Sequence, residues 1–450
     1  MSFRRDFAPS GFFVLRTPLL PFDELSAWRE GADRAELERR LREAYERPEL
    51  REALYLASPQ LCDTLDAWGS AHARKSLPAL ISYFERAASR PTPFGAFAGC
   101  SLGEIGERTR LELDQRSRYT RHTRLDMDYL TALAGALEAH PPVRGRLTFR
   151  PNSSLYRAGG RLRYAESRLD GTLRSYHLVA VDDSDELEAT LECASGGATP
   201  DELAAALVGD GISLDEARGF VDELINAQVL VSDLQPAVTG PEPAPGLADM
   251  MAEYEETVEA ATALRAAQDS LEQLDRQGLG AQPADYRRIE SLFQSQPTKP
   301  EPSRLFQLDL MKPARANLGR KVVNEIARAL ELLAELTPPI RNDPLERFRA
   351  AFHERYEDRE VPLVEALDDE IGIGFDASQA SESAPLLAGL KLGSPDWDGA
   401  RWEERDRLLL HLVGNALRDG RRELELTPAE IEALATGRQP RLPDALEVVA

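Results

Sequence analysis

The segment FERAASRPTPFGAF, residues 84–97, carries side chains that could bind an anion. Arg86 and Arg90 are four residues apart, so they share one face if the preceding helix continues that far. Their forked guanidinium donors suit phosphate and carboxylate oxygens. A structural role is the alternative, because cations at a helix C-terminus often stabilise its last carbonyls. The pattern by itself leaves both roles open.

A second group of cations lies between residues 108 and 124. It comprises Arg108, Arg110, Arg116, Arg118, Arg121, His122 and Arg124, against Glu112 and Asp114. Such a stripe could contact phosphates, or it could be a strand edge kept from aggregating by its charges. The whole chain has a formal charge of −23, from 54 basic and 77 acidic residues. This balance argues against nucleic-acid binding except at a local basic surface.

Several kinds of catalytic site have no support in the sequence. We find no GxxxxGK[ST] loop, no HExxH motif and no GxSxG turn, and the six histidines lack metal-ligand spacing. The three cysteines, Cys62, Cys100 and Cys193, are too widely spaced for a disulfide framework or a metal site. A reducing, cytoplasmic location fits them best. We therefore expect no metal, and neither a self-contained hydrolase nor an ATP-dependent ligase.

The elements that must position these residues begin with an α+β part, residues 1–151. Its pattern predicts a strand over residues 10–20 and a charged helix over residues 33–47 that Asp33 caps. A second helix is predicted over residues 76–89, capped by Ser76 and ended by two prolines. This helix would carry Arg86 to the surface.

Residues 152–235 form a separate predicted module. A hairpin about Gly159-Gly160 and a third strand come first, followed by three helices and a final strand, QVLVS. Two of the helices begin with capping boxes, at Thr199 and Ser213. This order is typical of a winged helix-turn-helix.

A Pro/Gly-rich linker is predicted over residues 236–247, and a mostly helical region over residues 248–450. Within this region we expect a strand at 304–312 and a strong helix at 314–336. The chain ends in the apolar run LPDALEVVA, which suggests truncation within a domain. No stretch reaches the roughly 18 apolar residues of a membrane span, so we expect a soluble protein.

Taken together, six motifs in order resemble the class I lanthipeptide (lantibiotic) dehydratases, in the N-terminal part of their tRNA-dependent glutamylation domain. The motifs are LRTP (15–18), RAASRPTPFG (86–95), RLD (124–126), PNSS (151–154), FQLD (306–309), and FHERY, VPL and GIG (352–374). The resemblance implies an α+β glutamylation-domain fold of several subdomains. It also implies an embedded winged helix-turn-helix module for peptide recognition.

Members of this family move glutamate from glutamyl-tRNA to Ser and Thr hydroxyls of a precursor peptide, and the glutamate is later eliminated. Because the ester is already activated, no cofactor beyond the glutamyl-tRNA co-substrate is expected. The resemblance assigns catalytic roles to Arg86, Arg90, Thr92, Asp126 and Asp309. Asp128 is an alternative to Asp126, and Arg16 is a weaker candidate. The basic stripe supplies the expected tRNA contacts, Arg116, Arg118, Arg121 and Arg124.

In the family, the leader of the precursor peptide adds a strand to the third strand of the winged module and packs on its third helix. The matching third helix here carries Asp215, Glu216, Asp222 and Glu223 against a lone Arg218. The negative charge of this predicted helix disfavours DNA binding, so we expect peptide binding instead. The expected leader contacts are Leu173, Arg174, Ser175, Tyr176, His177, Leu178, Val179, Phe220 and Leu224.

Two other functions stay open. A related type of enzyme, the peptide aminoacyl-tRNA ligase, appends an amino acid to a peptide C-terminus and shares the N-terminal motifs. A scaffold could also bind leader and tRNA without catalysis. Further expected partners are an elimination domain or protein and a lanthipeptide cyclase. The sequence leaves open whether the protein forms a homodimer.

Overall fold

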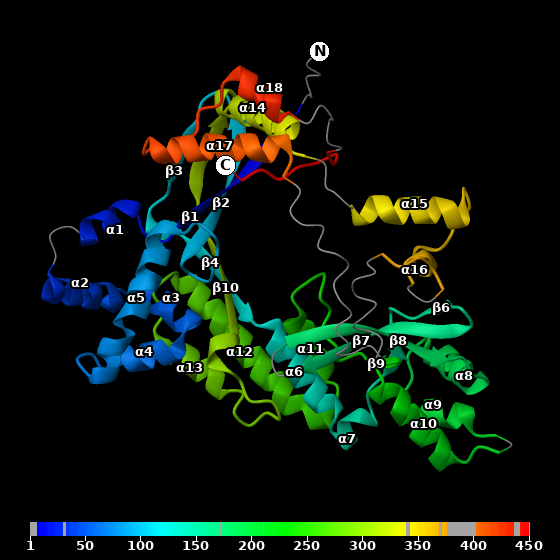
Figure 1. Ribbon diagram of the computed structural model, residues 1–450. Coiled ribbons are helices and arrows are strands. Elements are labelled where there is room, and N and C mark those ends of the chain that lie inside the picture. Colours follow the sequence, from blue (N-terminus) through cyan, green and yellow to red (C-terminus); the bar gives the residue numbers. More distant parts are fainter. Residues whose placement is uncertain are drawn as a thin grey trace. The chain divides into compact units, whose positions relative to one another are not determined.

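The computed structural model of the chain mixes helices with strands (Figure 1). It describes residues 7–29, 33–170, 173–209, 211–338, 343–368, 371–375, 402–435 and 442–449. The chain divides into one unit of residues 10–319 and a second unit of residues 1–9 and 320–450. The predicted α+β class is confirmed.

A six-stranded sheet runs through the unit of residues 10–319. Five strands follow the order β3-β11-β2-β10-β4, and β1 pairs with β2 outside that order. The strands are β1 (Phe12–Pro18), β2 (Ala98–Gly106), β3 (Arg110–Leu113), β4 (Thr120–Leu125), β10 (Phe306–Met311) and β11 (Ala314–Gly319). Since β10 and β11 insert among the N-terminal strands, residues of the predicted parts 1–151 and 248–450 share one sheet.

The strand register aligns four residues across this sheet. Arg16 of β1 lies opposite Cys100 of β2, which also faces Met311 of the parallel strand β10. Met311 in turn pairs with Thr120 of β4. The row crosses four neighbouring strands, from β1 to β4. Since adjacent strands are about 4.8 Å apart, its two ends are separated by roughly 14 Å.

Strands β4 and β10 each bury one face and expose the other. Along β10, Phe306, Leu308 and Leu310 are buried while Gln307 and Asp309 are exposed. The alternation has the period of two that a half-buried strand requires. The buried face packs against helices, with Phe306 set edge-on to Tyr286 at 5.1 Å between ring centroids. The other face of β10, which carries Gln307 and Asp309, is exposed.

Five helices follow β1. They are α1 (Phe22–Arg29), α2 (Arg34–Glu46), α3 (Pro48–Ala57), α4 (Pro59–Asp66) and α5 (Ala71–Ser89). Asp33 caps α2 as predicted, accepting a 2.8 Å hydrogen bond from the Glu36 amide. Helix α5 begins earlier than predicted, because Ser70 is its cap. The hydroxyl of Ser76, the predicted cap, instead donates to the His72 carbonyl within the helix.

Residues 149–232 contain the predicted hairpin, third strand and helices. The elements are β5 (Phe149–Pro151), β6 (Tyr156–Ala158), β7 (Arg161–Asp170), β8 (Leu173–Asp182), α8 (Asp185–Ala194), α9 (Pro200–Leu207), α10 (Leu214–Asn226) and β9 (Leu230–Ser232). Both capping boxes form, at Thr199 and Ser213. Strand β9 pairs with β5 and not with the three-stranded sheet β6-β7-β8. The segment therefore includes residues before the predicted start at 152.

Helices α6 (Met127–Glu138) and α7 (Pro141–Arg144) connect β4 to this segment. After it come α11 (Pro243–Met251), α12 (Val258–Gln277) and α13 (Pro283–Ser291). Helix α11 starts inside the predicted linker 236–247, since proline fits the first turn of a helix. The predicted strand at 304–312 is confirmed as β10, but residues 314–319 of the predicted helix pair as β11 with β2 and β3.

The second unit contains α14 (Arg320–Leu336), α15 (Pro344–Tyr356), α16 (Leu363–Ala366), α17 (Glu404–Arg418) and α18 (Pro428–Leu434). Here the FHERY and GIG motifs meet, because the Arg355 guanidinium donates to the carbonyls of Ile371, at 2.6 Å, and Gly372. A Cβ on Gly372 would lie 2.1 Å from the Glu365 carbonyl oxygen. These motif residues thus hold the backbone together. Across the described ranges, every helix is too short or too polar to cross a membrane.

Candidate functional site

An ion pair and an amide bridge lie on the exposed face of β4 and β10. The guanidinium of Arg124 donates to the carboxylate of Asp309, and both side chains are accessible, at 32% and 60% exposure. Next to them, Gln307 Nε2 donates a 2.7 Å hydrogen bond to Asp126 Oδ2. The structure thus brings together the two predicted aspartates, and we call these four residues the acidic face.

Asp126 occupies its position because it also caps helix α6. Its Oδ1 accepts a 2.8 Å hydrogen bond from the Asp128 amide, while Oδ2 holds Gln307. Asp128 is exposed, and among the described residues its backbone amide is the part that contacts Asp126. Of the two alternatives in the sequence, Asp126 is therefore the one that belongs to the acidic face.

One neighbour of the acidic face, His122, was named from the sequence only as a member of the basic stripe and was not predicted to lie beside the aspartates. His122 pairs in register with Asp309, and its Nε2 hydrogen-bonds the carboxylate of Glu242 at the start of α11. Its Nδ1 lies 4.0 Å from Asp275 Oδ2. The alternation of β4 could have revealed His122, since it lies two residues before Arg124. Glu242 gave no signal, because it lay in the predicted linker.

The second predicted group lies where α5 ends. Helix α5 stops at Ser89 and Arg90 is extended, so the helix does not continue as far as a shared helix face of Arg86 and Arg90 would require. The Arg86 guanidinium lies over the Phe94 ring, 4.4 Å from its centroid. Arg90 and Thr92 are exposed. Among the described residues, neither arginine pairs with Asp126 or Asp309, whose partners are Gln307 and Arg124.

Backbone hydrogen bonds hold the end of α5 against the end of β1. The Leu20 amide donates to the Ala87 carbonyl and the Leu19 amide to the Phe97 carbonyl, both at 2.8 Å. Arg16 on β1 is half-buried. Among the described residues, no carboxylate pairs with Arg16, Arg86 or Arg90. We call Arg16, Arg86, Arg90 and Thr92 the basic corner. The row from Arg16 to Thr120 crosses the sheet from this corner to β4, the strand that carries Arg124.

A buried lysine next to this corner was not predicted. Lys312 follows β10, is 1% exposed, and donates a 2.7 Å hydrogen bond from Nζ to the Pro18 carbonyl. Burial, and to a smaller extent the charge of Arg116, lowers the pKa of its ammonium group to about 8. A single lysine after a strand gives no sequence signal for burial. Lys312 adds a fourth cation near the end of β1.

The four arginines predicted to contact tRNA have different environments. Arg118 is the most exposed, at 71%, and pairs with Asp114. Arg116 is 36% exposed and pairs with Glu49, while Arg124 belongs to the acidic face.

Arg121 does not fit the predicted tRNA contact, because its side chain is fully buried. It pairs with Glu52 and Asp275, and Glu52 also accepts a 2.8 Å hydrogen bond from the Tyr286 hydroxyl. No phosphate can reach a guanidinium enclosed in this way. The assignment of Arg121 to tRNA is therefore corrected to a structural role, while Arg116, Arg118 and Arg124 stay predictions.

Strand β8 is an edge strand: among the strands of the described residues, it pairs with β7 alone. Tyr176 and Leu178 are 67% and 55% exposed. Nearby, Arg174 bonds the Ser167 hydroxyl and the Ser175 hydroxyl bonds His177. Val179 and Phe220 pack partly against the core. The side chain of Leu173 lies outside the described residues.

Leu224 was predicted to contact the leader, but it is only 7% exposed. Helix α10 turns this residue into the core together with Val221 and Ile225. A peptide on the surface could not reach it, so we remove Leu224 from the predicted contacts.

The opposite edge of the β6-β7-β8 sheet is closed by side chains. Beyond β6, Gln228 both accepts from the Ser167 amide, at 2.9 Å, and donates to its carbonyl, at 2.8 Å. The Ala165 amide donates to the Ser154 hydroxyl at 2.9 Å. The backbone of β7 is therefore satisfied on this side, which leaves the outer edge of β8 for strand addition.

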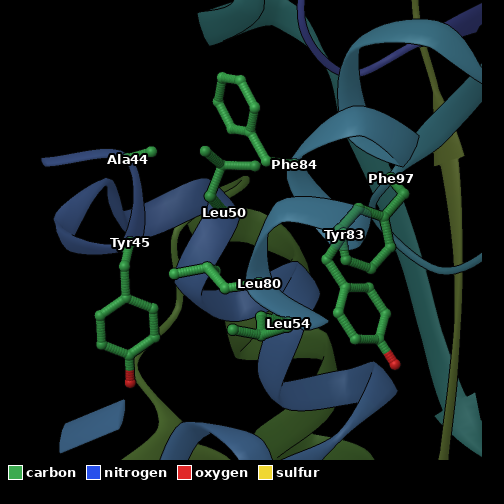
Figure 2. Close-up of a pocket in the computed structure, with 8 residues that line it drawn as sticks. All are labelled: Ala44, Tyr45, Leu50, Leu54, Leu80, Tyr83, Phe84 and Phe97. Carbon is green, nitrogen blue, oxygen red and sulfur yellow. The ribbon is translucent and has the colours of Figure 1, made fainter. Parts of the chain in front are cut away.

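The cavity drawn in Figure 2 lies between helices α2, α3 and α5. It has a volume of about 10 Å³, roughly that of one water molecule. Its lining is apolar apart from two tyrosines: Ala44, Tyr45, Leu50, Leu54, Leu80, Tyr83, Phe84 and Phe97. A charged substrate would not be stable there, so we place the candidate site on the acidic face and basic corner.

Comparison with known proteins gives a consistent family. The family model "Lantibiotic dehydratase, N terminus" matches residues 46–450. Over 403 residues the chain is 25% identical to the subtilin biosynthesis protein SpaB of Bacillus subtilis, covering 86% of this chain and 37% of that protein. The chain thus spans well under half the length of this relative.

Two solved structures are also similar. The tRNA dependent lantibiotic dehydratase MibB from Microbispora sp. 107891 superposes with a TM-score of 0.68 at 26% identity, over 95% of this chain and 40% of that chain. The glutamylation domain TbtB from thiomuracin biosynthesis gives a TM-score of 0.51 at 20% identity, over 89% of this chain and 50% of that chain. The second likeness concerns the fold alone.

Proposed function

The chain belongs to the lantibiotic dehydratase N-terminal family, and on that premise we propose that it transfers glutamate from glutamyl-tRNA to Ser and Thr hydroxyls of a ribosomally made precursor peptide. The observation that carries this proposal is the juxtaposition of Asp126 and Asp309 on one exposed sheet face, with Arg124 and Gln307 holding the two carboxylates. The arrangement offers fixed carboxylates to a substrate that brings its own activated ester.

The basic corner supports a role in binding the acceptor end of tRNA. Arg16, Arg86 and Arg90 have no carboxylate partner among the described residues, although the chain as a whole is strongly acidic. Unpaired guanidinium groups keep their donors free for phosphate or for the glutamate side chain. Arg116 and Arg118 would extend this surface along the tRNA backbone.

The acidic face fits the reacting atoms. The acceptor hydroxyl oxygen attacks the glutamyl ester carbonyl, a new ester bond forms, and the bond to the tRNA ribose oxygen breaks. The hydroxyl proton passes to a carboxylate and then to the leaving ribose oxygen, so protons balance. One aspartate would serve this transfer while the other holds the glutamate α-amino group. Because the ester is already activated, positioning of the hydroxyl and the ester provides most of the rate acceleration of the transfer.

The precursor peptide would bind through its leader to the outer edge of β8. An edge strand offers unpaired backbone groups, and Tyr176 and Leu178 offer apolar contact to alternate side chains of an added strand. A leader held there would deliver successive Ser and Thr residues to the acidic face. Elimination of glutamate and ring formation would then fall to an elimination domain or protein and to a cyclase.

Mass spectrometry tests the proposal. The protein is incubated without ATP with tRNA charged with isotope-labelled glutamate and the precursor peptide encoded beside its gene. We expect labelled glutamyl groups on Ser or Thr side chains, and none with Asp309→Asn. Asp249→Asn, which alters an exposed carboxylate that likewise pairs with an arginine, serves as the matched control.

Two results would overturn the proposal. An amino acid attached to the peptide C-terminus would indicate a peptide aminoacyl-tRNA ligase. An unmodified peptide that nevertheless binds the protein together with tRNA would indicate a scaffold.

A further inference from the structure

Phe94 is an exposed aromatic residue among the cations of the basic corner. It is 48% exposed, whereas Ala96 and Phe97, which follow in the same turn, are buried. Single exposed apolar residues are common and need no function. Phe94 differs because one planar cation already covers its ring and another, Arg90, precedes it by four residues.

The ring of Phe94 is part of a stack. The Arg86 guanidinium lies 4.4 Å from its centroid, and Phe97 is nearly parallel to it, at 6.2 Å and 19°. Phe97 stacks in turn on Tyr83, at 5.4 Å and 20°, as the two neighbouring rings in Figure 2 show. The 6.2 Å separation makes the Phe94–Phe97 contact strongly offset, which agrees with the exposure of the Phe94 ring.

The backbone fixes this ring in place. The Phe97 amide donates to the Phe94 carbonyl at 3.2 Å, and Gly95 between them has a φ of +52° that a side chain would disfavour. Phe97 is anchored by burial and by its carbonyl, which accepts from Leu19. Phe94 therefore presents a fixed aromatic surface to solvent.

We propose that Phe94 is a stacking platform for the 3′-terminal base of tRNA. This inference rests on the proposed function and names a residue that recognises one part of its substrate. Single-stranded nucleic-acid ends are bound by exposed aromatic rings that stack on bases and by arginines that contact phosphates or add to the stack. Phe94 provides the ring, Arg86 supports it, and Arg90 lies within reach of the adjoining phosphates.

Binding of uncharged tRNA for glutamate tests the proposal without requiring catalysis. Two forms are compared at one fixed salt concentration: the intact tRNA, and the same tRNA with an abasic 3′-terminal ribose, which keeps every phosphate. We expect the protein to bind the intact form about tenfold more tightly, the size of one stacked base. Phe94→Ala and Phe94→Leu should bind both forms equally, while Phe94→Tyr should keep the preference.

The control variant is Trp402→Ala. Trp402 is a similarly exposed aromatic residue, at 55%, with no arginine stacked on it among the described residues. The Trp402→Ala variant should retain the tenfold preference for intact tRNA. Thermal melting checks that each variant is folded.

Other outcomes separate the two proposals. Phe94→Leu could keep the preference for intact tRNA, or Phe94→Ala could weaken binding of both tRNA forms by the same factor. Either result would show that the ring does not stack on the base, and would refute the stacking platform. If the unmodified protein binds neither tRNA form, the proposed use of tRNA fails and the platform fails with it. If it binds both forms equally, only the platform fails.

Discussion

Lys312 donates a 2.7 Å hydrogen bond to the carbonyl of Pro18, so a side chain that leaves the end of β10 holds the end of β1. It passes Gly99 of the intervening strand β2, where a Cβ would lie 2.9 Å from the lysine Cδ. Its ammonium group also lies 5.0 Å from the centre of the Tyr119 ring. Lys312 thus fixes the strand that leads into the basic corner relative to the strand that carries Asp309.

The first prediction concerns pH and Lys312. Burial lowers its pKa from an ordinary value of 10.5 to about 8 in the folded protein. Between these values the unfolded chain binds a proton that the folded chain does not, so stability rises with pH. We compare the free energy of unfolding of the native protein with that of Lys312→Met. The native value minus the variant value should increase by up to roughly 3 kcal/mol from pH 7 to pH 10.5.

Urea unfolding of both proteins at several pH values measures this difference. Other lysines and tyrosines titrate in both proteins and cancel. A difference that stays constant over this range would show that Lys312 is not buried as described.

The second prediction concerns the buried pair of Arg121 and Glu52. Glu52→Gln should destabilise the fold by about 3 kcal/mol, because it leaves a buried guanidinium with one fewer carboxylate partner. Glu43→Gln, which alters an exposed carboxylate paired with Arg39, should cost less than about 1 kcal/mol. Chemical denaturation measures both. Equal small losses would mean that Arg121 is accessible to solvent, and would restore it as a candidate for tRNA contact.

The third prediction concerns the arginines of the basic corner. Arg86→Ala and Arg90→Ala should each lower glutamyl transfer at least about 100-fold, because each removes a charged donor that positions the substrate. Arg74→Ala, at an exposed position near the start of the same helix, should leave the rate unchanged. The measurement is glutamyl adduct per unit time, with circular dichroism on every variant. Unfolding of the first two variants would instead assign these arginines to the stability of the helix end.

The fourth prediction concerns the edge strand β8. Tyr176→Ala combined with Leu178→Ala should weaken binding of a fluorescently labelled leader peptide about 70-fold, since losing roughly 100 Å² of apolar contact at about 25 cal/mol per Å² costs about 2.5 kcal/mol. Both side chains are exposed, so the melting temperature should hardly change. Val238→Ala, at an 86% exposed position outside this sheet, is the control. Unchanged leader affinity in the double variant would place the peptide elsewhere.

Local patterns in the sequence determined much of the secondary structure. The capping boxes at Thr199 and Ser213 and the turn at Gly159-Gly160 form as predicted, because each depends on hydrogen bonds or dihedral angles within a few residues. The alternation of residues 304–312 likewise predicted a strand, and the structure places Asp309 on the exposed face of that strand. The motif residues themselves were sufficient to indicate the family.

Only the tertiary structure decided how these parts combine. Arg118 and Arg121 look alike in the sequence, yet one is exposed and the other is enclosed by Glu52 of α3 and Asp275 of α12. Residues 314–319 fit the periodicity of a helix but form a strand, because β2 and β3 supply backbone partners. The contact of Lys312 with Pro18 depends on the same long-range pairing. Such choices depend on partners far away in the chain, and these leave no periodic signal in the local sequence.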